Sequence, residues 1–89
     1  MPGPTASPVD TTQLLGRFPE DTALIIRLLA ENEVFRSVCE DYTLARVTLA
    51  RLKGTHQAHE TPELVEYRRL VADLEREIAG ALRNAKQMR

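Results

Sequence analysis

The chain has 89 residues, with 12 basic and 13 acidic side chains and a formal net charge of −1, which is enough for one small domain. Because the charges nearly balance and are interspersed, the sequence argues against a basic surface for nucleic acid or acidic membranes. The single cysteine, Cys39, excludes an internal disulfide and is typical of a reducing compartment. No apolar run approaches the ~20 residues of a membrane span, and the start lacks the pattern of a secretory signal, so we expect a cytoplasmic protein.

Residues 1–12 are rich in proline, glycine, serine and threonine. A segment of this composition buries too little apolar surface to offset the loss of chain entropy. We therefore predict a disordered arm over residues 1–12 and a single helical domain over residues 13–87.

The first predicted helix covers about residues 19–31. Pro19 lies just inside its start, followed by two acids in the first turn, and both features are favoured at helix N-termini. Apolar residues then surround much of its circumference, so the helix must be covered on more than one side. Asn32 can cap a new helix, and we predict a kink or a fresh helix start there.

Two longer helices are predicted at about residues 33–53 and 61–86. Each has apolar residues at alternating steps of three and four, which is a heptad seam. Gly54 is expected to end the first as a C′ glycine, and Thr61 to cap the second, with Pro62 at its first position. Gly80 lowers helix propensity in the second, so we expect fraying beyond it.

The two seams fit each other in an antiparallel register. Facing residues in such a hairpin keep a constant sum of residue numbers, and six seam pairs sum to 116. Large residues face small ones, as with Phe35 and Ala81. We predict an all-α fold, a short helix followed by a long coiled-coil-like antiparallel hairpin. The seam comprises Phe35, Val38, Tyr42, Ala45, Leu49, Leu52, Leu64, Tyr67, Val71, Leu74, Ile78 and Ala81.

Residues 18 to about 80 resemble the YdcH-like family of small bacterial proteins. The resemblance lies in Phe18-Pro19-Glu20, Leu24-Ile25, Arg27-Leu28, Glu31-Asn32, Phe35, Val38, Leu49, Leu52 and Gly54. It implies a short helix followed by a helical hairpin, with no established catalytic role. Tyr42 stands where the family often has histidine, and Ala45 where it often has leucine. The arginine-rich stretch YRRLVADLERE and the added N-terminal arm also differ, and these departures bear on a shared partner more than on the fold.

The connection over residues 54–60 holds both histidines. His56, His59 and Glu60 offer two nitrogen ligands and one oxygen ligand, whereas a structural zinc site takes four and a catalytic one at least three on a rigid frame. We interpret the segment as a solvated bend and predict no metal and no cofactor. Two such loops meeting in an oligomer could still complete a site.

The sequence predicts no enzyme. The acids from Glu60 onward alternate with arginines, and we expect most of them to face solvent and to form surface pairs such as Asp73 with Arg76, with no separated pKa values. These acids are Glu60, Glu63, Glu66, Asp73, Glu75 and Glu77. Ser37 has no histidine at triad-like reach, and there is no glycine-rich phosphate loop. Cys39, beside the seam, is expected to pack as a small apolar residue.

The apolar surface exceeds what one hairpin and one short helix can bury, so we predict a non-enzymatic homo-oligomer, dimeric or larger. The candidate surface is Leu24, Ile25, Ile26, Leu28, Leu29, Leu44, Val47 and Leu70. An alternative is an adaptor that takes a partner helix in a groove between the first helix and the hairpin. A further alternative is weak nucleic-acid binding, although acids interrupt the basic stripe and no aromatic residue lies within it. The stripe is Arg69, Arg76, Arg83, Lys86 and Arg89.

Overall fold

The structure, a computed structural model, describes residues 9–55 and 61–87. Within these ranges every regular element is a helix, which confirms the predicted all-α fold. The elements are α1 (Thr11–Arg17), the 3-10 turn η1 (Pro19–Asp21), α2 (Thr22–Glu31), α3 (Glu33–Thr55) and α4 (Pro62–Gln87).

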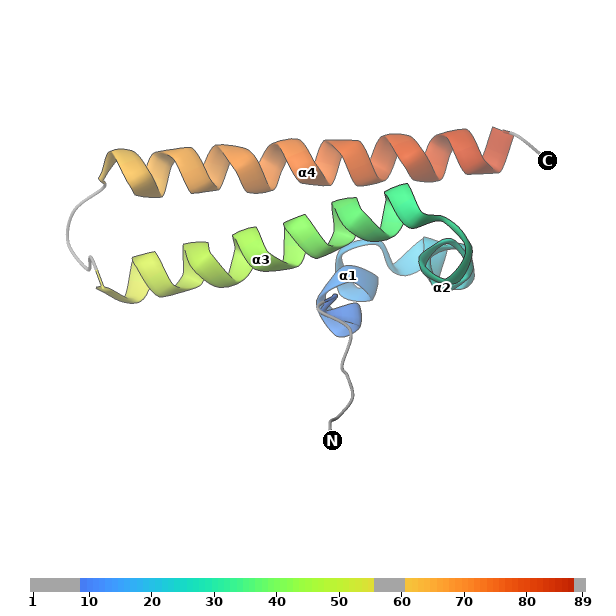
Figure 1. The fold of residues 1–89 in the computed structure, drawn as a ribbon, viewed down its shortest axis with the longest axis horizontal. Coiled ribbons are helices and arrows are strands. Elements are labelled where there is room, and N and C mark those ends of the chain that lie inside the picture. Colours follow the sequence, from blue (N-terminus) through green and yellow to red (C-terminus); the bar gives the residue numbers. More distant parts are fainter. Residues whose placement is uncertain (1–8, 56–60, 88–89) are drawn as a thin grey trace.

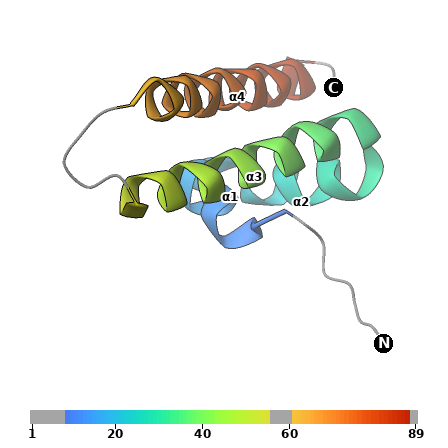
Figure 2. The same cartoon turned by 60° about the vertical axis from the view of Figure 1, so that its left-hand side comes forward.

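Helices α3 and α4 lie side by side and antiparallel along most of their length, as Figures 1 and 2 show. The seam lies between them. Its buried members are Phe35, Tyr42, Ala45, Leu64, Val71, Leu74 and Ile78, and its half-buried members are Val38, Leu49, Leu52, Tyr67 and Ala81. The Tyr42 hydroxyl bonds to Glu75, the residue next to Leu74, which is the predicted partner of Tyr42. This contact agrees with the register at mid-hairpin, and the full six-layer register stays a prediction.

The N-terminal elements lie on the α3 side of the hairpin, away from the outer side of α4 (Figure 1). Helix α2 is seen end-on in that view, so it crosses the hairpin and does not run along it. Leu14 of α1 and Ile25 of α2 are the buried anchors, and both join the core formed by the seam. The core is therefore one cluster shared by α1, α2, α3 and α4.

Residues 9–12 differ from the expected disordered arm. Val9 is buried, and the Asp10 carboxylate accepts a hydrogen bond from the Gln13 amide at 3.2 Å, which caps α1. The Asp10 amide donates to the Thr43 hydroxyl at 3.0 Å, so α3 fixes the helix start. The prediction of disorder was wrong for these four residues, because contacts with α3 order them. Residues 1–8 lie outside the described residues.

The predicted start signals of α3 and α4 are confirmed. The Asn32 side chain accepts from the Phe35 amide at 3.0 Å, and a new helix begins at Glu33. The Thr61 hydroxyl accepts from the Leu64 amide at 3.1 Å, with Pro62 as the first helical residue of α4. Each cap satisfies an amide that the helix itself leaves unpaired.

The two glycine-based expectations for the helix ends were wrong. Helix α3 continues through Gly54 to Thr55, and no described glycine has a positive φ, so Gly54 is not a left-handed C′ residue. Helix α4 continues past Gly80 to Gln87. Leu82, one residue beyond the seam, is buried in the core and holds this last part of the helix.

Candidate interaction surface

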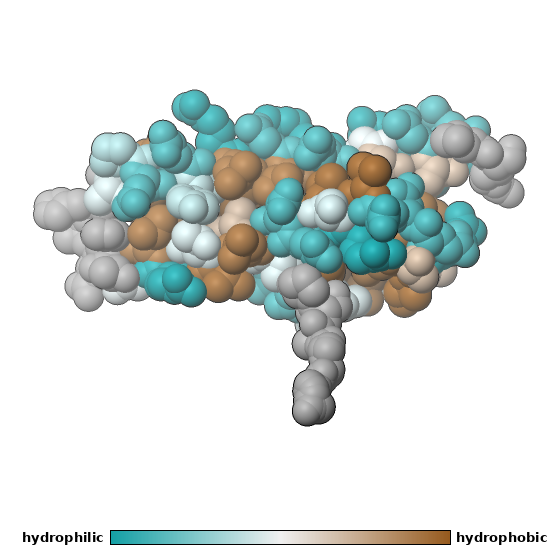
Figure 3. Space-filling model, in the orientation of Figure 1, coloured by the Kyte–Doolittle hydropathy of each residue, from teal (hydrophilic) through white to brown (hydrophobic). Residues whose placement is uncertain are grey.

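Several large apolar side chains remain exposed on the described part of the chain. They are Ile26, Val34, Leu44, Val47, Val65 and Leu70. Single exposed apolar residues are ordinary, but contiguous ones indicate a contact surface. Leu44 and Val47 lie one turn apart on α3 and are 66% and 48% exposed, so they form a patch. Figure 3 shows apolar surface over both α3 and α4.

The structure divides the predicted surface in two. Ile26, Leu44, Val47 and Leu70 are exposed. Leu24, Leu28 and Leu29 are half-buried against the core. Ile25 is 0% exposed, so its assignment to an interaction surface was wrong, because it lies on the side of α2 that packs into the core. The prediction missed Val34 and Val65, which lie outside the apolar periodicity.

The groove expected between the first helix and the hairpin is present as a hollow whose exposed lining is mostly apolar. A hollow of about 440 Å³ is bounded by Leu28 of α2, Phe35 of α3 and Ala81 of α4, with polar side chains at its margin. Phe35 is buried, and so contributes little accessible area. The use of this hollow by a partner helix stays a prediction.

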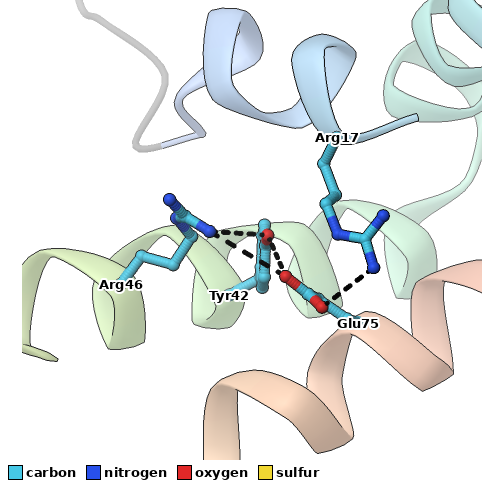
Figure 4. A network of polar contacts seen from close by, with 4 residues as sticks. All are labelled: Arg17, Tyr42, Arg46 and Glu75. Carbon is cyan, nitrogen blue, oxygen red and sulfur yellow. Dashed lines mark hydrogen bonds and ion pairs between the residues drawn. The ribbon is translucent and has the colours of Figure 1, made fainter. Parts of the chain in front are cut away.

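The most developed polar cluster centres on Glu75 of α4 (Figure 4). Its Oε1 accepts from Arg17 Nη2 of α1 at 3.3 Å, and its Oε2 accepts from the Tyr42 hydroxyl of α3 at 2.8 Å. Arg46 Nη1 donates to the Tyr42 oxygen at 3.2 Å and lies 3.9 Å from Glu75 Oε2. The Glu75 side chain is only 21% exposed, so Glu75 is an exception to the prediction that most of these acids face solvent.

The charges of this cluster suit a structural role. Burial raises the pKa of Tyr42, and the hydrogen bond it donates to Glu75 raises that pKa further. The hydrogen bond to Glu75 likewise raises the pKa of Arg17. A tyrosine with a raised pKa is a poor proton donor near neutral pH, since an efficient catalytic group has a pKa near the operating pH. The cluster connects α1, α3 and α4 through one carboxylate.

A second ion pair connects η1 to the far end of α4. Lys86 Nζ lies 2.8 Å from the Asp21 carboxylate, whose side chain is largely buried. Arg76 pairs with Asp73 on the surface of α4, as predicted. Two residues of the basic stripe thus already have acidic partners, and Arg89 lies outside the described residues. The pairing lowers the positive charge that this stripe presents to a nucleic acid.

Cys39 is buried beside Tyr42, and its prediction as a small apolar residue is confirmed. Burial raises the pKa of the thiol to about 12, and the neighbouring Glu40 adds to the shift. Since the thiolate is the nucleophile and the metal ligand, this cysteine has little reactivity near neutral pH.

The predicted solvated bend with His56, His59 and Glu60 falls outside the described residues and stays a prediction. Across 9–55 and 61–87, no group of three or more histidine, cysteine or acidic side chains is placed to hold a metal ion. In the same ranges, no helix has the length and apolar character needed to cross a membrane.

Comparison of the chain with protein-family models, with curated proteins and with solved structures found no match. The resemblance to the YdcH-like family therefore stays a prediction.

Proposed function

We propose that the chain is a non-enzymatic protein that acts through helix packing and associates with itself. The supporting observation is the exposed pair Leu44 and Val47 on the 23-residue helix α3. Fully burying such a side chain is worth roughly 1.5–3 kcal/mol. A few of these residues, each present in both copies, can offset an association cost of about 4–15 kcal/mol.

The size of the domain supports the same proposal. A chain of this length buries only about 60% of its unfolded surface, and partner chains commonly add to such small cores. Two hairpins packed at about 20° form a four-helix arrangement that needs no new element. The same surface on both copies would give an isologous, closed dimer.

The resemblance to the YdcH-like family supports a bacterial protein without catalysis, and we place it in the cytoplasm because its only cysteine is a free, buried thiol. Membership in that family is part of the proposal. The family resemblance bears on the fold and the absence of catalysis, whereas the exposed pair on α3 bears on the association.

A second candidate function is that of an adaptor, favoured by the exposed Ile26 on α2. Ile26 borders a hollow of about 460 Å³ together with Val9 and Leu29. A partner helix could place one apolar side chain there. The two candidates predict different sensitive positions, α3 for self-association and α2 for the adaptor.

Sedimentation at micromolar concentration tests both. We expect a wild-type dimer, and a shift to monomer in Leu44→Glu with unchanged helical circular dichroism. Ile26→Asp should leave the dimer largely intact. A fully helical wild-type monomer with sharp NMR lines would contradict self-association and favour the adaptor.

A further inference from the structure

Helix α3 has a second stripe with heptad spacing, which we call the outer stripe. It steps by three and four residues, as the seam does, through Ser37, Glu40, Leu44, Val47, Arg51 and Gly54. At 3.6 residues per turn, its mean direction lies about 160° from that of the seam. The outer stripe therefore points away from α4.

The N-terminal elements leave the outer stripe open. Their contacts with α3 use the flank between the two stripes, where Thr43 accepts from Asp10 and Arg36 donates to the Leu29 carbonyl. Every residue of the outer stripe is exposed except Glu40, which is half-buried. Among the described residues, Leu44 and Val47 remain 66% and 48% exposed.

The outer stripe has charges of opposite sign on the two sides of its apolar pair. Glu40 precedes the apolar pair and Arg51 follows it, four residues away on either side. Arg51 already has an interaction within its own chain, so a contact with a second copy would be added to that interaction. Small residues, Ser37 and Gly54, lie at the two ends, where they permit close approach of another helix.

This order is self-complementary when two copies run antiparallel. Facing residues then have numbers that sum to 91, which places Leu44 opposite Val47, Glu40 opposite Arg51, and Ser37 opposite Gly54. Because of the two-fold symmetry, each of these pairs occurs twice in the dimer. A parallel arrangement would instead place Glu40 against Glu40 and Arg51 against Arg51, and like charges at such positions repel.

We propose that a second copy of this chain packs antiparallel on the outer stripe, with the two-fold axis passing between Leu44 and Val47. This inference rests on the proposed function and specifies its interface. A helix of another protein would need a positive charge opposite Glu40 and a negative charge opposite Arg51. A second copy in the antiparallel arrangement supplies both. Leu70 on α4 and Ile26 on α2 lie outside this interface.

Charge reversal tests the interface in the full chain, with sedimentation equilibrium as the readout and circular dichroism as the check on folding. Glu40→Arg creates two like-charged pairs with Arg51 of the second copy, and Arg51→Glu creates two with Glu40. Each single variant should raise the dimer Kd about tenfold, since each changes two charge pairs. The variant with both reversals restores two opposite-charge pairs and should return the Kd to near the wild-type value.

The apolar centre supplies a matched pair of variants. Leu44→Glu should raise the Kd by more than about a hundredfold, because two buried leucines are lost per dimer. Leu70→Glu, also an exposed leucine on the hairpin, should leave the Kd unchanged. Glu40→Gln removes the attraction without adding repulsion and should weaken the dimer less than Glu40→Arg.

The outcomes separate this inference from the proposed function. If the wild type is a dimer and neither single reversal raises its Kd, or if the double reversal does not restore the Kd, the outer-stripe interface is overturned and self-association still stands. A wild type that stays monomeric at all accessible concentrations would overturn both. Rescue by the double reversal supports the antiparallel arrangement directly.

Discussion

The two stripes of α3 share one spacing and differ in everything else. The seam toward α4 holds Phe35, Tyr42 and Ala45, which are buried, and α4 covers them with matching apolar residues. The outer stripe holds only two large apolar residues, Leu44 and Val47, with a charge on either side, and both remain exposed. Heptad spacing alone therefore does not say whether a stripe is buried within the chain or left exposed.

The difference lies in how much apolar area each stripe offers. Six apolar layers can hold a hairpin, because each buried side chain adds roughly 1.5–3 kcal/mol. Two apolar residues per copy are too few to fold a chain. On the proposed interface they would contribute to a reversible contact whose direction is set by the charges. Substitutions on the seam should therefore act on unfolding, and those on the outer stripe on association.

The largest expected effect is on the seam. Ile78→Ala should lower the free energy of unfolding by about 2–5 kcal/mol, because Ile78 is fully buried and its loss leaves a cavity. Leu70→Ala, on the same helix but exposed, should cost far less. Urea denaturation of both variants measures the contrast. Equal losses would contradict the burial of Ile78 and the exposure of Leu70 in the structure.

A smaller loss is expected at the polar cluster. Glu75→Gln should destabilise the fold by about 1–3 kcal/mol, because Arg17 and Arg46 lose their shared anion. Asp73→Asn is the control, since its pair with Arg76 is exposed and such pairs are worth about 0–1 kcal/mol. Thermal melts at low and high salt compare the two. If Asp73→Asn costs as much as Glu75→Gln, the cluster has no special role.

High pH should lower the stability of the fold because two buried groups of α3, Cys39 and Tyr42, ionise. The pKa of Cys39 rises from 9.0 to about 12 on folding, and that of Tyr42 rises above 10.0. Both groups are neutral when protonated, so their contribution is complete below pH 9 and is lost as pH rises through the folded values. Denaturation between pH 8.5 and about 12 should show a steeper decline in wild type than in Cys39→Ala with Tyr42→Phe. Parallel curves would contradict the assigned burial.

The smallest effect is a gain in stability on α4. A Cβ added at Gly80 would meet only Arg83 Nη2 at 3.7 Å, which is ordinary contact. Gly80→Ala should therefore stabilise the fold by about 0.5–1 kcal/mol through helix propensity and reduced chain entropy in the unfolded state. Gly16→Ala in α1, where a Cβ would have no neighbour within 4 Å, is the companion variant. A loss at Gly80 would indicate a close contact there that the structure lacks.

The hairpin was predictable because its signals are local. Heptad spacing and the caps at Asn32 and Thr61 involve residues three or four apart, which is the range that helix geometry governs. Helix α1 depends instead on distant contacts. Seven residues are too few for an independent helix, and Leu14 and the Thr43 hydroxyl stabilise it. Asp10 followed three residues later by Gln13 resembles a capping box, and this signal could have located it.

The polar cluster and the buried face of α2 could not be found from periodicity. Glu75 and Leu82 are seven residues apart, on the flank of α4 toward the N-terminal elements. The sequence pattern does not say which flank of a hairpin a preceding helix covers. For the same reason Ile25 could not be separated from its exposed neighbour Ile26. The side on which α1 and α2 pack depends on tertiary contacts, chiefly the burial of Leu14 and Ile25 in the core.

Intermolecular paramagnetic relaxation tests the central claim most directly. Ser37→Cys chains without ¹⁵N would carry a nitroxide at residue 37 and would be mixed with ¹⁵N-labelled wild type. The buried Cys39 should not compete for the nitroxide at neutral pH. Because facing numbers sum to 91, the amides near Gly54 of the second copy should broaden most, and those near Gly80 should not. Broadening centred near residue 37 itself, or confined to α4, would contradict antiparallel packing on the outer stripe.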